Sequence, residues 1–153
     1  MKTREQHSSG QGKKIGIIIS QFNEFITKRL LRGCLDELSS RGVRKNSITV
    51  VWVPGSYEIP LIALKLAKKK SIHAVICLGS IIRGETIHFD LVAHNTARGI
   101  AQASLLTGKP VIFGVLATET VEQAYKRSQE KGENKGRDAA LAALKMVNLL
   151  SKL

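Results

Sequence analysis

The sequence predicts an α/β fold: a three-layer sandwich in which a four-stranded parallel sheet is flanked by helices on both faces. Two observations support this fold class. Short apolar runs alternate with amphipathic helical patterns along the whole chain, which is typical of βαβ units. Of the 153 residues, 43% are hydrophobic and 24% are charged, which is the composition of a globular domain.

Four β-strands are expected where continuous apolar runs end in turn residues. They cover residues 14–20, 48–53, 73–79 and 111–116. Continuous apolar runs of this length are typical of parallel strands that are covered on both faces. Each run is far shorter than the roughly 18 residues that a membrane-spanning helix requires.

Helices are expected after each strand, where apolar residues recur at helical spacing. They cover residues 24–40, 56–69, 89–106 and 137–150, and a short segment that begins at Thr118 or Thr120 and ends at Arg127. Ser56 has the residue type of an N-cap, and Gly42 ends the first helical pattern. No linker or repeat interrupts the alternation, so a single domain over residues 14–153 is expected.

The N-terminal segment and the cysteines both favour a cytoplasmic protein. Residues 1–13 are polar and lack the apolar stretch of a signal peptide, so we interpret them as a flexible arm. Cys34 and Cys77 form no CxxC pair, and each lies within an apolar pattern. Two buried, reduced thiols are therefore favoured over a disulfide.

The net charge of +12 allows several partners, because a basic protein attracts nucleic acid, anionic membranes or phosphorylated ligands. A basic nucleic-acid-binding domain is one alternative, and it would bind generic DNA or RNA with a steep salt dependence. However, the basic residues are scattered along the chain and only 5% of residues are aromatic. No nucleic-acid-binding motif is present, so we expect a solvated basic surface and neither a nucleic-acid nor a membrane partner.

The predicted sheet also indicates where a site should lie, because ligands bind beyond the carboxyl ends of parallel strands. This rule selects the loops at residues 20–23, 54–58, 80–88 and 117–120. The loop at 80–88 opens a helix, so the backbone N–H groups of Glu85 and Thr86 can converge on an anion. Gly79 and Gly84 are spaced as in a P-loop, but Glu85 stands where the lysine should be, which disfavours a nucleoside triphosphatase.

His88 is the strongest candidate for proton transfer. It lies at the mouth of a selected loop, whereas His7 lies in the arm, His73 starts a strand and His94 lies inside a helix. A histidine at such a place can donate or accept protons near neutral pH. His94 follows His88 by six positions, which puts the two on different faces of a helix and makes them a poor metal pair.

Other candidates each have a structural alternative. Phe22 could stack on a planar ring, or it could pack onto the following helix. Glu58 could accept hydrogen bonds from ligand hydroxyls, or it could complement a helix N-terminus. Arg127 and Lys135 would suit phosphate or carboxylate binding, although cations near a helix end are also common as surface charge.

Taken in order, the segments resemble one enzyme family from about Lys14 to Leu149. The resemblance rests on Phe22-Asn23, Val53-Pro54-Gly55-Ser56-Tyr57-Glu58-Ile59-Pro60, Gly79-Ser80-Ile81-Ile82-Arg83-Gly84-Glu85-Thr86-Ile87-His88-Phe89-Asp90, Phe113-Gly114-Val115, Glu122-Gln123-Ala124, Arg127 and Gly132-Glu133-Asn134-Lys135-Gly136. The family is 6,7-dimethyl-8-ribityllumazine synthase, the penultimate enzyme of riboflavin biosynthesis. The resemblance to this family implies a flavodoxin-like fold.

The resemblance implies a transferase that condenses 5-amino-6-(D-ribitylamino)uracil with 3,4-dihydroxy-2-butanone 4-phosphate. The product is 6,7-dimethyl-8-ribityllumazine, and phosphate and water are released. No metal and no organic cofactor is implied. The alternative is a catalytically silent relative that forms a shell or scaffold.

The resemblance also implies a role for each matching residue. Phe22 stacks on the pyrimidine ring, while Asn23 and the turn formed by Ser56, Tyr57 and Glu58 hold the ribityl chain. The residues that line the ring pocket and reach the polar edge of the ring are Ser80, Ile81, Ile82, Phe113 and Lys135. Glu85, Thr86 and Arg127 bind the phosphate, and His88 transfers protons.

The resemblance further implies a homopentamer with active sites at subunit interfaces. Twelve pentamers close into a 60-mer shell in some members of the family, and the loop before Asn134 has no insertion of the kind seen in pentamer-only members. An association with riboflavin synthase is a further expectation.

Overall fold

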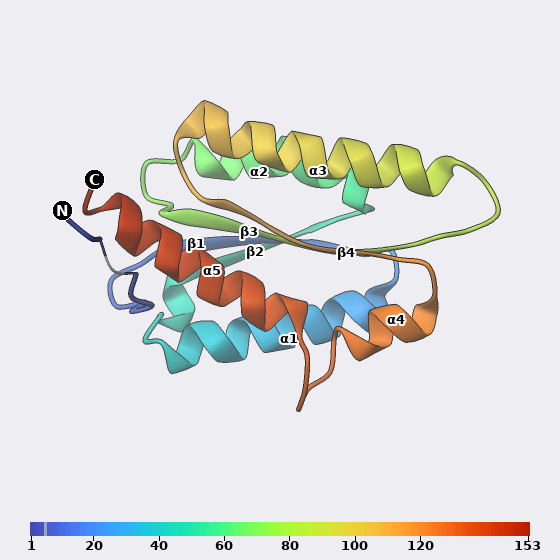
Figure 1. Cartoon of the computed structure of the whole chain (residues 1–153), viewed down its shortest axis with the longest axis horizontal. Helices are drawn as coiled ribbons and strands as arrows, with labels where there is room; N and C mark the ends of the chain where they lie inside the picture. Colours follow the sequence, from blue (N-terminus) through green and yellow to red (C-terminus); the bar gives the residue numbers. More distant parts are fainter. Residues whose placement is uncertain (5) are drawn as a thin grey trace.

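The computed structural model describes residues 1–4 and 6–153 and shows the predicted three-layer α/β sandwich (Figure 1). The sheet has four parallel strands in the order β2-β1-β3-β4. The strands are β1 (Ile15–Ser20), β2 (Ile48–Val53), β3 (Ala74–Ile82) and β4 (Val111–Thr118). The α-helices are α1 (Glu24–Ser40), α2 (Ile59–Ala67), α3 (His88–Thr107), α4 (Val121–Lys126) and α5 (Lys135–Leu150).

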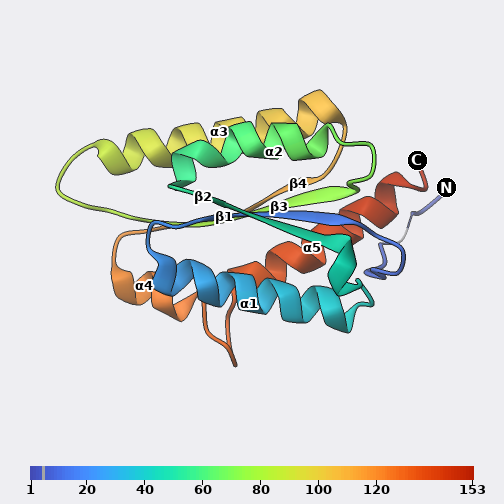
Figure 2. The same cartoon turned by 180° about the vertical axis from the view of Figure 1, so that it is seen from behind.

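Helices cover both faces of the sheet, with α2 and α3 on one side and α1, α4 and α5 on the other (Figures 1 and 2). The period-two alternation of side chains along a strand creates two cores. Ile17 and Ile19 of β1 belong to the core beneath α1 and α5, whereas Ile18 belongs to the core beneath α2 and α3. Strand β1 is therefore fully buried, as its continuous apolar run predicts.

Two strands run further than the sequence predicts. Strand β3 continues to Ile82 and β4 to Thr118, because residues 79–82 pair with residues 115–118. The expectation that the loop after β3 begins at Ser80 is therefore wrong, and Ser80 is 2% exposed within the sheet. The edge strand β2 is also less buried than β1, with Trp52 38% exposed.

The helix starts show which predicted caps are used. Ser56 does not cap a helix: it begins a 3-10 turn (Ser56–Glu58) and is buried, while the Glu58 carboxylate accepts a hydrogen bond from the Gly55 N–H at 2.9 Å. Thr120 caps α4, because its hydroxyl accepts the N–H of Gln123 at 3.2 Å. Helix α5 starts at Lys135, two residues before the predicted start, because Asn134 caps it.

Both cysteines are buried and unpaired, as predicted. Residue 5 of the predicted arm at 1–13 lies outside the described residues, but Ser9 and His7 contact the domain. Their carbonyl oxygens accept hydrogen bonds from Asn148 Nδ2 at 2.8 and 3.2 Å. The flexibility of the arm stays a prediction. Within residues 1–4 and 6–153, no helix is long and apolar enough to cross a membrane.

Candidate active site

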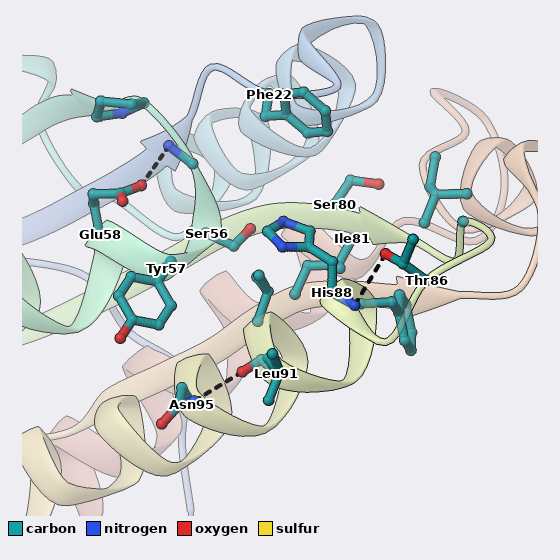
Figure 3. Close-up of a pocket in the computed structure, with 16 residues that line it drawn as sticks. Phe22, Ser56, Tyr57, Glu58, Ser80, Ile81, Thr86, His88, Leu91 and Asn95 are labelled. Atoms are coloured by element: carbon teal, nitrogen blue, oxygen red, sulfur yellow. Dashed lines mark hydrogen bonds between the residues drawn. The ribbon is translucent and has the colours of Figure 1, made fainter.

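A cavity of about 750 Å³ lies at the carboxyl edge of the sheet, beyond β1, β2 and β3 and beside the first turns of α3. Figure 3 shows its lining. The residues that line it are Phe22, Pro54, Gly55, Ser56, Tyr57, Glu58, Ser80, Ile81, Ile82, Gly84, Thr86, His88, Phe89, Leu91, Val92 and Asn95. Nine residues of the predicted site are thus brought together by segments that are far apart in sequence.

The turn after β1 presents Phe22 at the rim of the cavity. The Phe22 ring is 72% exposed, and its N–H donates to the carbonyl of Pro54 at 3.1 Å. Asn23 does not line the cavity: it has a left-handed backbone with φ 58°, and its side-chain amide donates to the Ser80 carbonyl at 2.7 Å. Asparagine tolerates this conformation better than most residues. Asn23 therefore connects the turn that carries Phe22 to β3.

The turn after β2 supplies the polar wall. Ser56 is 6% exposed, and a methyl group on Gly79 would lie 2.6 Å from its Oγ. Glycine at 79 thus allows β3 to approach this turn closely. One carboxylate oxygen of Glu58 accepts a hydrogen bond from the Gly55 N–H. Glu58 thus complements the start of this helical turn, which is one of the two roles that the sequence allows for it. Tyr57 is 59% exposed and lines the cavity beside them.

His88 is the first residue of α3, and its side chain projects into the cavity (Figure 3). Its backbone N–H donates to Thr86 Oγ1 at 3.3 Å. The imidazole is exposed and forms no hydrogen bond with another described residue. It is therefore free to exchange protons with a molecule bound in the cavity.

The loop before α3 is held at both ends by Arg83. This guanidinium donates to Glu119 at 2.7 Å and to both oxygens of Asp90 at 3.1 and 3.2 Å, and it lies 4.3 Å from the centre of the Phe89 ring. The hydrogen bonds from Arg83 lower the pKa of the Asp90 carboxyl. Between these contacts, the backbone N–H groups of Glu85 and Thr86 bond to no described residue. Thr86 lines the cavity, whereas Glu85 is exposed beside it.

Five residues of the predicted site do not line this cavity. Asn23 and Glu85 lie in the segments that border it, whereas Phe113, Arg127 and Lys135 belong to other elements. Phe113 is 41% exposed on β4, the edge strand furthest from β2. Arg127 follows α4, and its guanidinium donates to the Gln123 carbonyl at 3.0 Å. Lys135 begins α5, and its N–H donates to the Arg127 carbonyl at 2.9 Å. Within one chain, the predicted site residues therefore form two groups: those that line or border the cavity, and those on β4, after α4 and at the start of α5.

Helix α3 supplies a part of the cavity wall that the sequence motifs do not include. Leu91, Val92 and Asn95 line the cavity together with His88. They follow His88 by three, four and seven positions, which is the spacing of one helix face. The helical spacing from an inward-facing His88 is therefore the signal that indicates them.

One comparison with known proteins identifies the family. Residues 12–151 match the family described as 6,7-dimethyl-8-ribityllumazine synthase. The match covers nearly the whole chain of 153 residues, including all the elements that form the cavity. The chain therefore belongs to the 6,7-dimethyl-8-ribityllumazine synthase family, whose members are transferases of riboflavin biosynthesis.

Proposed function

We propose that this chain catalyses the family's reaction in the cavity at the carboxyl edge of its sheet. The observation that carries the proposal is the position of His88, an exposed imidazole that shares one cavity with an exposed aromatic ring and a polar turn. We expect the reaction to take place in the cytoplasm and the product to pass to riboflavin synthase.

The cavity suits the ribitylaminouracil. Phe22 can stack on the planar pyrimidine ring, and Ile81 and Ile82 add apolar surface beneath it. The Ser56 hydroxyl and the free oxygen of Glu58 can hydrogen bond to the hydroxyls of the ribityl chain. Asn23 would act indirectly in this arrangement, by holding the turn that carries Phe22.

The butanone phosphate fits the exposed loop before α3. The unpaired N–H groups of Glu85 and Thr86 lie next to a helix N-terminus, where an anion is favoured. The Thr86 hydroxyl can add a further donor, and Arg127 would supply the cation that binds phosphate. Because phosphate is the leaving group, these contacts would stabilise charge where it develops in the transition state.

His88 would move the protons. The amine of the uracil adds to the ketone, and loss of water gives an imine. Elimination of phosphate then leaves an enol, which tautomerises to a new carbonyl at the carbon that carried the 3-hydroxyl. The ribityl-bearing nitrogen closes the ring on this new carbonyl with loss of a further water. Each step transfers a proton, and His88 can take one in one step and return it in the next. Holding two substrates in register would supply much of the remaining acceleration.

A second copy of the chain would complete the site. Phe113, Arg127 and Lys135 lie outside the cavity of their own chain, so we expect a neighbouring copy to present them to it. A ring of identical subunits, in which β4 and α4 of one chain face the cavity of the next, makes such head-to-tail contacts around a closed axis. We propose a homopentamer of this kind, which can assemble further into a 60-mer.

The first experiment follows the fluorescence of the lumazine product from the two purified substrates. The variant His88→Ala should lose about 100- to 10,000-fold in kcat, the typical contribution of a general acid–base group. His94→Ala is the matched control on the same helix. Removing the Arg127 guanidinium from the leaving group should cost a similar factor. Full activity in both the His88 and the Arg127 variant would contradict the proposed roles of these two residues. No product from the folded wild type would favour the scaffold alternative.

Mixed oligomers test the shared site. His88→Ala and Arg127→Ala chains should each be nearly inactive, but mixing them before assembly should restore about a quarter of the sites, because some sites then combine two intact halves. A mixture with no more activity than its components would contradict a site shared between chains.

A further inference from the structure

The amino edge of the sheet, opposite the cavity, carries a band of positive charge. Each strand is preceded by at least one cation. In sheet order these are Arg44 and Lys45 before β2, Lys13 and Lys14 before β1, Lys68, Lys69 and Lys70 before β3, and Lys109 before β4. Because the strands are parallel, these four segments lie side by side, and we call them the basic band. It lies at the left end of the molecule in Figure 1.

Hydrogen bonds join three of the four segments of the band. Lys109 Nζ donates to the carbonyl oxygens of Lys69 and Ile72 at 2.7 and 2.8 Å, which joins the segments before β3 and β4. The N–H of Lys14 donates to Nδ1 of His73 at 2.9 Å, which joins the segments before β1 and β3. Burial, Lys13 and Lys109 lower the pKa of His73, as expected in a positive environment.

Few carboxylates oppose this charge. The segments 10–14, 44–47, 68–73 and 107–110 contain no Asp or Glu. Glu37 lies at the C-terminal end of α1, but Arg41 already binds it at 2.9 Å. By contrast, the carboxyl edge carries Glu58, Glu85 and Glu119. The positive charge of the band is therefore not neutralised by carboxylates of its own segments.

We propose that the basic band binds the phosphate backbone of double-stranded nucleic acid without reading its sequence. Within the four segments, Ile72 and Pro110 are buried and no residue is aromatic. The band thus offers cations to phosphates, but it has no ring to stack on unpaired bases and no apolar side chain to insert into a bilayer. The cations are scattered in sequence and gather only in the fold, which is why the sequence alone indicates no nucleic-acid partner.

A matched pair of variants tests the proposal. The first changes Lys68, Lys69 and Lys70 of the band to Gln, and the control changes Lys28, Lys126 and Lys131, which are exposed near the opposite edge, to Gln. Each variant lowers the net charge by 3, from +12 to +9. Binding of a fluorescently labelled DNA duplex is measured by anisotropy between about 50 and 200 mM salt, the range in which phosphate contacts are revealed.

The band variant should bind the duplex about tenfold more weakly, and its slope of log affinity against log salt should fall by about 0.9 for each phosphate that is no longer neutralised. The control should stay within about twofold of the wild type. Equal weakening of both variants would show that net charge alone attracts DNA and would overturn the proposal. No binding by the wild type at about 50 mM salt would overturn it as well.

Anionic vesicles form the second arm of the experiment, because Leu105 and Leu106 near the C-terminal end of α3 are 86% and 67% exposed. Binding to vesicles but not to the duplex would assign this end to membranes and refute the proposal. Far-UV circular dichroism and thermal unfolding check the fold of each variant, so the result does not depend on catalysis. The band variant should also keep lumazine formation, since the cavity lies at the other edge.

Discussion

Asn134 is expected to contribute more to stability than any other polar residue near Arg127 and Lys135. It is 2% exposed, and both the oxygen and the nitrogen of its side-chain amide form hydrogen bonds. Oδ1 accepts the N–H groups of Gly136 and Arg137 at 2.9 and 3.1 Å, which caps α5. Nδ2 donates to the carbonyl oxygens of Arg29 and Gln129 at 3.2 and 3.1 Å, which ties α1 to the loop before α5.

These hydrogen bonds set the expected magnitude. Loss of an N-cap costs about 1 kcal/mol, and each partly buried carbonyl that loses its donor costs about 1 kcal/mol more. Asn134→Ala should therefore lower the free energy of unfolding by about 3 kcal/mol, a large part of the roughly 5–15 kcal/mol of a typical domain. Asn134→Ser keeps a capping oxygen but loses both donors, so about 2 kcal/mol is expected.

The assay is urea unfolding followed by circular dichroism, at one protein concentration because association adds to apparent stability. Thr120→Ala is the control: it removes the cap of α4, whose single hydrogen bond of 3.2 Å is exposed, and should cost about 0.5–1 kcal/mol. If Asn134→Ala costs no more than this control, the two bonds to α1 and the loop contribute nothing and the reasoning is refuted.

Three further predictions concern packing and protonation. Gly136→Ala should prevent folding or lower the yield of soluble protein, because the new methyl group would overlap a backbone carbonyl of α1, whereas Gly84→Ala should be tolerated since nothing lies within 4 Å. Burial raises the pKa of both Cys34 and Cys77, so a thiol reagent at pH 8 should label them only after unfolding; rapid labelling of native protein would contradict this. Because the pKa of His73 is lowered in the fold, its contribution to stability should be complete above the unfolded value of about 6.5 and be lost as the pH falls through the folded value. His73→Asn should flatten that pH dependence in urea unfolding, and an unchanged profile would show that another group causes it.

The fold could be read from the sequence where local pattern and tertiary pairing agree. The bounds of α1 and β2 follow from helical spacing and from an apolar run that ends at Pro54. The end of β3 could not be predicted, because Gly79 and Ser80 have the residue types of a turn, and only pairing with β4 keeps them extended. The unexpected role of Ser56 has the same origin, since its burial depends on the close approach of Gly79.

The candidate site was predictable in part for a similar reason. The strand-end rule finds Phe22 and His88, because it needs only the order of strands and loops. It cannot tell which residues share a cavity within one chain, so it does not separate Phe113 and Arg127 from the others. That separation depends on the sheet order, which places β4 at the edge furthest from β2.

The hydrogen bond between Asn23 and the Ser80 carbonyl has a consequence for the geometry of the cavity under thermal motion. Strand β3 leads directly into the loop and helix that carry His88, and through Asn23 it also anchors the turn that carries Phe22. The Phe22 ring and the His88 imidazole are thus both connected to β3. When the rim of the cavity moves, the two groups should move with the same strand, so their separation is preserved better than the separation of either group from a neighbouring chain.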